Sequence, residues 1–183
     1  MSVETLLTFT LASTLLALAP GPDNLFVLLQ SALYGRKAGL LITLGLCSGL
    51  VFHTTLLAAG VAAIFLVNTL AFNLLKFVGA AYLIYLAIQA YRAKSIPVGT
   101  DSPPALAPWR LYRRGILMNI TNPKVGIFFL AFLPQFASSQ NGSIALQIMK
   151  LGCIFMLASL LVFSALAVLA SKLAPWFTRS YKA

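Results

Sequence analysis

Long apolar stretches, separated by short polar segments, make up most of this chain. A helix needs ~20 residues to cross the hydrocarbon of a bilayer. Five stretches are long enough, near residues 5–34, 38–66, 69–91, 115–137 and 144–171. Their residues are continuously apolar rather than alternating with polar ones, which favours helices over the strands of a membrane barrel. The pattern therefore predicts an all-α membrane protein with five transmembrane helices.

Polar residues and prolines interrupt the first and the fourth of these stretches. The interrupting segments are Pro20-Gly21-Pro22-Asp23-Asn24 and Asn119-Ile120-Thr121-Asn122-Pro123-Lys124. Proline removes a backbone donor and glycine adds conformational freedom, so a helix is expected to break in both segments, at Pro20, Gly21, Pro22 and Pro123. Charges and unpaired backbone groups are costly in hydrocarbon unless protein or a polar cavity receives them. Both segments are therefore candidates for a transport site.

The composition agrees with a lipid environment. Of the 183 residues, 60% are hydrophobic and 9% are charged. Soluble domains carry about 25% charged residues, and a soluble protein of this size cannot hide so much apolar surface. Cys47 and Cys153 lie inside predicted spans without metal-ligand spacing. We interpret both as small apolar residues and expect no metal site.

The net charge of +10 suggests nucleic-acid binding, but the distribution of the basic residues argues against it. If the spans alternate in direction, ten of the thirteen basic residues fall on one side: Arg36, Lys37, Arg92, Lys94, Arg110, Arg113, Arg114, Lys172, Arg179 and Lys182. The connections on the other side, near 67–72 and 138–143, contain no lysine or arginine. Basic residues concentrate on the cytoplasmic side of membrane proteins. We therefore expect the N-terminus outside, the 92–114 loop inside, and no nucleic-acid partner.

The first apolar stretch has an alternative interpretation as a signal peptide. Residues 6–18 can form its apolar core, and Ala17-Leu18-Ala19 is similar to a cleavage site. However, the residues before this core include Glu4 and no lysine or arginine, and the apolar pattern resumes after Asn24. We therefore favour a broken membrane span.

The two interrupted spans occur in the order expected of an inverted repeat. The first enters from outside and the fourth from inside, and broken helices in matching places point to the binding site of a secondary transporter. A single transmembrane domain, 1–183, then consists of repeat one (about 5–91), a cytoplasmic linker (about 92–114) and an incomplete repeat two (about 115–183). A complete 3+3 arrangement has six helices, so the pattern predicts that the last is missing. Surfaces that it would cover then face lipid or a partner, such as a second copy of the chain.

Asp23 and Lys124 are expected near the middle of the membrane at similar depth. At about 1.5 Å per helical residue, Asp23 lies roughly 20 Å from Arg36 and Lys124 about 15 Å from Arg114. An amino-acid zwitterion fits this arrangement, because its ammonium suits Asp23 and its carboxylate suits Lys124 or the free amides of a restarting helix. Neutral donors and acceptors are offered by Asn24, Asn119 and Asn122. Asp23 can also carry a coupling proton, or it can merely cap the helix and pair with a lysine.

Two further polar side chains are candidates for the transport pathway. His53 is the only histidine and lies in the second apolar stretch. It can relay protons or hydrogen-bond to a neighbouring helix. Tyr82, in the third stretch, can line the pathway through its hydroxyl or simply pack.

Three segments resemble the lysine-exporter and homoserine/threonine-exporter (LysE/RhtB) family of bacterial amino-acid efflux carriers. They are Pro20-Gly21-Pro22-Asp23-Asn24, then Leu75-Lys76-Phe77-Val78-Gly79-Ala80-Ala81-Tyr82-Leu83, and Asn122-Pro123-Lys124 continued by Phe128-Phe129-Leu130-Ala131-Phe132-Leu133-Pro134-Gln135-Phe136. The set spans most of the chain in the expected order. The resemblance implies six helices, location in the bacterial inner membrane, and export of amino acids or similar small metabolites driven by an ion gradient, with the proton as the expected coupling ion. The chain departs from the family by its five predicted helices.

Other classes of function have less support in the sequence. An enzyme needs a cluster of nucleophile, base or metal ligands, which one histidine and scattered acids do not provide. ATP hydrolysis is not expected, because the chain contains no G-x-x-x-x-G-K-[ST] motif, and we expect no cofactor. A truncated carrier, or a membrane subunit or scaffold that does not transport, is the alternative that the five-helix count leaves open. The sequence does not indicate which amino acid is carried.

Overall fold

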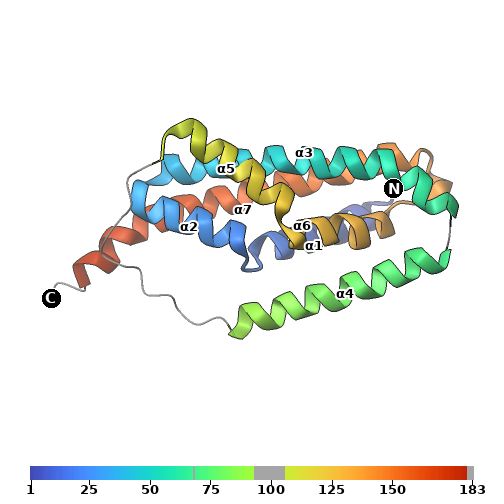
Figure 1. The fold of residues 1–183 in the computed structure, drawn as a ribbon, viewed down its shortest axis with the longest axis horizontal. Helices are drawn as coiled ribbons and strands as arrows, with labels where there is room; N and C mark the ends of the chain where they lie inside the picture. Colours follow the sequence, from blue (N-terminus) through green and yellow to red (C-terminus); the bar gives the residue numbers. More distant parts are fainter. Residues whose placement is uncertain (68, 93–105, 181–183) are drawn as a thin grey trace.

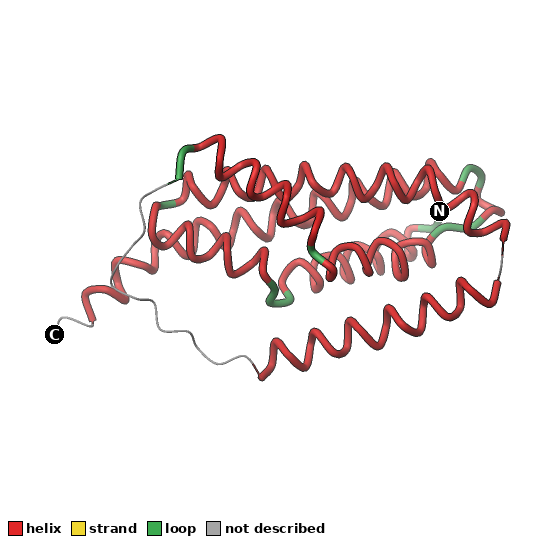
Figure 2. The backbone as a smooth tube through the Cα atoms, viewed as in Figure 1, coloured by secondary structure: helices red, strands yellow, loops and turns green. Residues whose placement is uncertain are grey.

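Helices account for all the regular structure in the part of the chain that the structure describes. The structure is a computed structural model that describes residues 1–67, 69–92 and 106–180, and no strand occurs in these ranges (Figure 2). The predicted all-α class is therefore confirmed. Residues 93–105 of the predicted linker lie outside the described residues, as does Lys182 near the C-terminus.

The first and the fourth predicted spans are each broken into two helical parts. The first consists of α1 (Val3–Leu18) and α2 (Pro22–Tyr34), which meet at an angle of 58°. The fourth consists of α5 (Pro108–Thr121) followed by Pro123–Phe136, with an angle of 49° between them. Residues 123–136 comprise α6 (Pro123–Ile127), the π-helical turn η1 (Phe128–Phe132) and the 3₁₀ turn η2 (Leu133–Phe136). Both breaks fall at the prolines, where the sequence predicts them.

The remaining long helices are α3 (Arg36–Val67), α4 (Thr69–Arg92) and α7 (Ile144–Ser180). Within the described residues, 36–60 of α3 and 144–174 of α7 are long and apolar enough to cross a membrane. The two bent pairs qualify if each is counted as one span, which gives two to four candidate spans. The predicted third span coincides with α4, which is not among these candidates. The count of five and the inverted repeat therefore stay predictions.

The helices run roughly parallel to one long axis, and the helix ends other than those at the two breaks lie toward its two opposite ends (Figure 1). The start of α3, the end of α4, the start of α5 and the end of α7 lie at one end. The N-terminus and the short helix η3 (Ser139–Asn141) lie at the other. The helix ends next to Arg36, Arg92 and Arg110 thus share one end of the bundle. We call the end that holds the N-terminus the N-terminal end.

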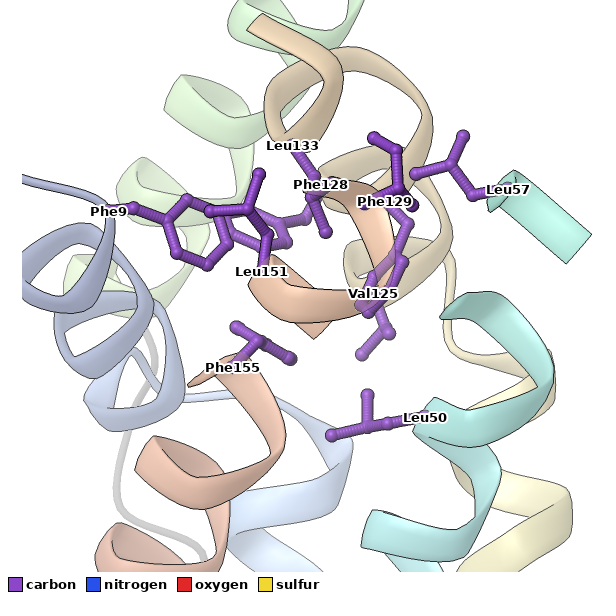
Figure 3. Close-up of a cluster of buried hydrophobic side chains, with 10 residues drawn as sticks. Phe9, Leu50, Leu57, Val125, Phe128, Phe129, Leu133, Leu151 and Phe155 are labelled. Carbon is purple, nitrogen blue, oxygen red and sulfur yellow. The ribbon is translucent and has the colours of Figure 1, made fainter. Parts of the chain in front are cut away.

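The centre of the bundle is the packing of α3 against α5 and α7. Gly45 of α3 and Gly115 of α5 permit this approach, because a Cβ atom on Gly45 would collide with the carbonyl oxygen of Tyr112. Small residues allow membrane helices to pack closely in this way. Between the N-terminal end and the breaks, the buried side chains form an apolar cluster around Phe9, Phe128, Phe129 and Phe155 (Figure 3). The polar site lies beside this cluster.

Candidate functional site

The first helix break leaves carbonyl groups at the end of α1 that need donors. Side chains from beyond the break provide them. Nδ2 of Asn24 donates to the carbonyl oxygen of Ala17 at 2.8 Å, and Nζ of Lys124 donates to that of Ala19 at 2.6 Å. Because a helix end buried without partners is costly, these contacts explain how the chain tolerates the break.

The second break has a local cap of its own. Asn122 ends α5, and its Oδ1 accepts a hydrogen bond from the backbone N–H of Lys124 at 3.0 Å. Pro123 occupies the first position of α6, where a backbone donor is not needed. The side chain of Lys124 is thereby directed across to the first break. The two breaks, a hundred residues apart in sequence, are in direct contact through this lysine.

Asp23 and Lys124 lie in the same buried polar region without forming a close ion pair. Asp23 is 4% exposed and Lys124 is 8% exposed. The carboxylate of Asp23 is close to the side chains of Asn122 and Asn119 and within electrostatic range of Lys124 and His53. Among the described residues, no ion pair shorter than 4.0 Å joins the two charges. The ammonium of Lys124 instead donates to the carbonyl of Ala19. This disfavours a close pair of Asp23 and Lys124, whereas a polar region that both charges face is compatible with the structure.

His53 connects the long helix α3 to the end of α5. The carbonyl oxygen of Asn119 accepts a hydrogen bond from Nε2 of His53 at 3.1 Å. The imidazole is buried, and its ring centroid lies 5.5 Å from that of Phe129. This is the hydrogen bond to a neighbouring helix that was one of the two interpretations of His53, and it places the imidazole at the edge of the polar region. A role in proton relay stays a prediction.

Three buried oxygen acceptors in this region have no donor. They are Oδ1 of Asp23, Oδ1 of Asn24 and Oδ1 of Asn119. Buried acceptors are nearly always satisfied, and each unsatisfied one costs about 1–3 kcal/mol. A ligand that brings several N–H donors would therefore be stabilised here, and an ammonium group has three.

Positive potential lies next to these acceptors. The first turn of α2 begins at Gly21 without a side-chain cap, so its free N–H groups carry the positive end of the helix dipole. Nζ of Lys124 lies 3.6 Å from the position that a Cβ atom on Gly21 would occupy. The uncapped helix start and the ammonium together suit an anionic group. Acceptors without donors and positive charge without an anion therefore occur side by side.

The structure groups most, but not all, of the residues that the sequence predicts for the site. Asp23, Asn24, Asn119, Asn122 and Lys124 are all buried and gather at the two breaks. Tyr82 lies on α4, where its ring contacts Tyr85 of the same helix. Helix α4 packs mainly on η1 and α6, but no hydrogen bond or ring contact of Tyr82 itself, within the described residues, reaches Asp23 or Lys124, and its pathway role stays a prediction.

Gln30 and Ser13 are buried polar residues that the sequence analysis did not identify. Gln30 is 7% exposed and Ser13 is 0% exposed, and a side-chain oxygen of each lacks a partner. Gln30 follows Asp23 by seven residues, so both lie on the same face of α2. This helical spacing from Asp23 is the signal in the sequence that could have identified Gln30.

The substrate sites of membrane transporters typically form where broken helices meet around buried charges, with free helix ends turned to the same region. The site thus defines a class of protein, the membrane transporters. Comparison with known proteins gives the family. A family model described as LysE type translocator matches residues 14–183, and the chain belongs to this family.

Several relatives are similar over most of the chain. The homoserine/homoserine lactone efflux protein of Salmonella typhimurium is 35% identical over 176 residues, which cover 96% of this chain and 85% of the relative. The uncharacterized membrane protein YrhP of Bacillus subtilis is 32% identical over 187 residues, covering 97% and 89%. The leucine efflux protein of Salmonella choleraesuis is 32% identical over 130 residues, covering 70% and 61%. No solved structure gave a significant match.

Proposed function

We propose that this chain is a secondary carrier that exports amino acids across the inner membrane of a bacterium. The observation that carries the proposal is the contact between two broken membrane helices around a buried carboxylate and a buried ammonium, Asp23 and Lys124. Membership of the LysE type translocator family supports it, as do relatives named for the efflux of homoserine and of leucine.

In this proposal the substrate binds as a zwitterion between two groups of opposite character. Its ammonium donates to the acceptors that lack partners, on Asp23, Asn24 and Asn119. Its carboxylate binds Lys124 and the free N–H groups at the start of α2. These contacts involve only the part that all amino acids share. We therefore expect the side chain of the substrate to be recognised elsewhere.

Export against a gradient requires that substrate exit be tied to the entry of an ion. Asp23 is the proposed coupling group, because a single buried carboxylate can hold either a substrate ammonium or a proton but not both. With the N-terminus outside, the basic ends of α3, α4 and α5 face the cytoplasm. Substrate then enters from the end that holds these basic residues and leaves at the N-terminal end.

The test is export of a panel of labelled amino acids from preloaded cells, with Asp23→Asn as the diagnostic variant. Asn keeps the size of the side chain and removes both the charge and the exchangeable proton. Asp23→Asn is expected to insert normally and to abolish gradient-driven export, and Asp23→Glu to retain part of it. Asp101→Asn makes the same chemical change between α4 and α5 and serves as the control. Failure of the unmodified chain to export any amino acid would refute the function, whereas wild-type export by Asp23→Asn would refute the site.

A further inference from the structure

A continuous series of aromatic contacts leads from the polar site toward the N-terminal end of the bundle. Its members come from α1, η1, η2 and α7, and we call them the aromatic barrier: Phe9, Phe128, Phe129, Phe132, Phe136 and Phe155. Phe128 lies 4.8 Å from Phe155 and 5.0 Å from Phe132, measured between ring centroids. Phe136 continues the series, at 5.0 Å from Phe132 and 5.1 Å from Phe9.

The two ends of this series are different in character. At one end, the ring of Phe129 lies 5.5 Å from that of His53, at the edge of the polar site. At the other end, Phe136 forms part of the wall of an open cavity. Phe9, Phe128 and Phe129 are at most 2% exposed, Phe155 is 3% exposed, and Phe132 is half-buried. Figure 3 shows Phe9 and Phe128 side by side between neighbouring helices. A charged solute that follows this series from the polar site to the cavity must displace aromatic rings, since entering their apolar packing is costly.

The cavity is polar and has a volume of about 420 Å³. Its lining residues come from the first turns of α1 and from the segment that runs from η2 to η3. These elements lie at the N-terminal end of the bundle (Figure 1). Six of its eight lining residues are polar: Glu4, Thr5, Thr8, Gln135, Ser138 and Asn141. Glu4 is the only charged residue among them, so the lining has acceptor and anionic character.

We propose that this cavity is a second ligand site, which holds the ammonium group of an exported amino acid after it leaves the site at Asp23. This inference rests on the proposed function. The carboxylate of Glu4 provides the charge, and the hydroxyl groups of Thr5 and Thr8 provide neutral acceptors on the same helix. The aromatic barrier separates the two sites. A solute in the cavity is thus already cut off from Asp23 and in contact with the exterior.

The cavity can be tested by chemical protection of a single cysteine. In a background with Cys47→Ala and Cys153→Ala, Thr8→Cys provides a thiol in the cavity wall. Ser139→Cys provides a thiol in η3, outside the lining, as the matched control. Intact cells are treated from outside with a membrane-impermeant maleimide. The ligands added outside are L-homoserine and L-leucine, compared with 4-hydroxybutyrate and 4-methylpentanoate, which lack the ammonium.

Both cysteines are expected to react, and an amino acid is expected to slow the reaction of Thr8→Cys alone. The ammonium-free analogues are expected to give no protection. Glu4→Gln should raise the concentration needed for half-protection by roughly three- to tenfold, because it removes a partly solvated charge partner. Asp23→Asn should leave this concentration unchanged, because the second site does not include Asp23.

Three results would overturn the second site, in addition to export without protection of Thr8→Cys. They are no labelling of Thr8→Cys from outside, protection that is indifferent to Glu4→Gln, and protection that disappears with Asp23→Asn. Export by the unmodified chain is measured in the same cells. Lack of export refutes the proposed function, whereas export without protection of Thr8→Cys refutes only the second site.

Discussion

Replacing Gly49 with alanine should displace the site residue Asn119. Gly49 lies on α3, facing the end of α5, and a Cβ atom there would be 2.7 Å from Cβ of Asn119 and 2.8 Å from its Oδ1. Ordinary contact begins at 3.4 Å, so Asn119 must move by at least 0.7 Å. Its carbonyl oxygen is bound by His53, so the whole end of α5 is expected to shift. When the rate of a step depends on the exact placement of its groups, displacements of this size can lower that rate ~10-fold or more, and we expect this for export.

Gly60→Ala is the matched control for this variant. Gly60 lies on the same helix, and nothing lies within 4 Å of the position of its Cβ atom. Overpacking typically costs about 1–3 kcal/mol, while alanine in place of glycine in a helix gains up to ~1 kcal/mol. We therefore expect Gly49→Ala to lower the thermal unfolding midpoint in detergent and to slow export, and Gly60→Ala to do neither. If the two variants behave alike in both assays, the close contact of α3 with Asn119 does not position the site.

Three further predictions concern the ammonium, the imidazole and the orientation. Lys124→Met should raise the KM for export by ~10-fold or more, since it removes a charged donor from the substrate carboxylate; an unchanged KM would mean that the carboxylate binds elsewhere. His53→Ala should lower stability by about 0.5–1.5 kcal/mol because it removes one of the two hydrogen bonds to the buried carbonyl of Asn119, the other coming from the backbone N–H of Asn122, whereas His53→Gln, which keeps a donor, should retain most of it; thermal unfolding of the two variants decides. In intact cells, an impermeant thiol reagent should label Ser139→Cys and not Ala107→Cys, in the cysteine-free background; the opposite pattern would reverse the orientation.

The location of the breaks was predictable from sequence because proline acts locally. Pro22 and Pro123 each stand at the first position of a new helix, wherever the rest of the chain lies. The similar depth of Asp23 and Lys124 was expected from their distance to the basic residues, and the lysine-to-carbonyl hydrogen bond brings the two breaks into contact. The partner of Lys124 was not predictable. A long flexible side chain can reach several acceptors, and the choice of Ala19 over Asp23 depends on how α1 ends in three dimensions.

The π-helical turn η1 and the cavity also escaped the sequence analysis. The apolar run from Phe128 to Phe132 fits an α-helix equally well, and a change of helical register of this kind depends on neighbours. One neighbour is Gly79 of α4, which accommodates Ala131 so closely that a Cβ atom on Gly79 would collide with it. The contacts of the phenylalanines with both His53 and the cavity wall require the tertiary structure.

The hydrogen bond from Lys124 to the carbonyl of Ala19 has a thermodynamic consequence for ligand binding. The ammonium satisfies a carbonyl that the end of α1 would otherwise leave without a donor. A bound carboxylate that attracts this ammonium would leave the carbonyl bare, unless another donor replaces it. Occupancy of the site and the shape of the first break are therefore linked quantities. Each must alter the free energy of the other by the same amount, so a variant that straightens the break will change affinity even if it touches no ligand.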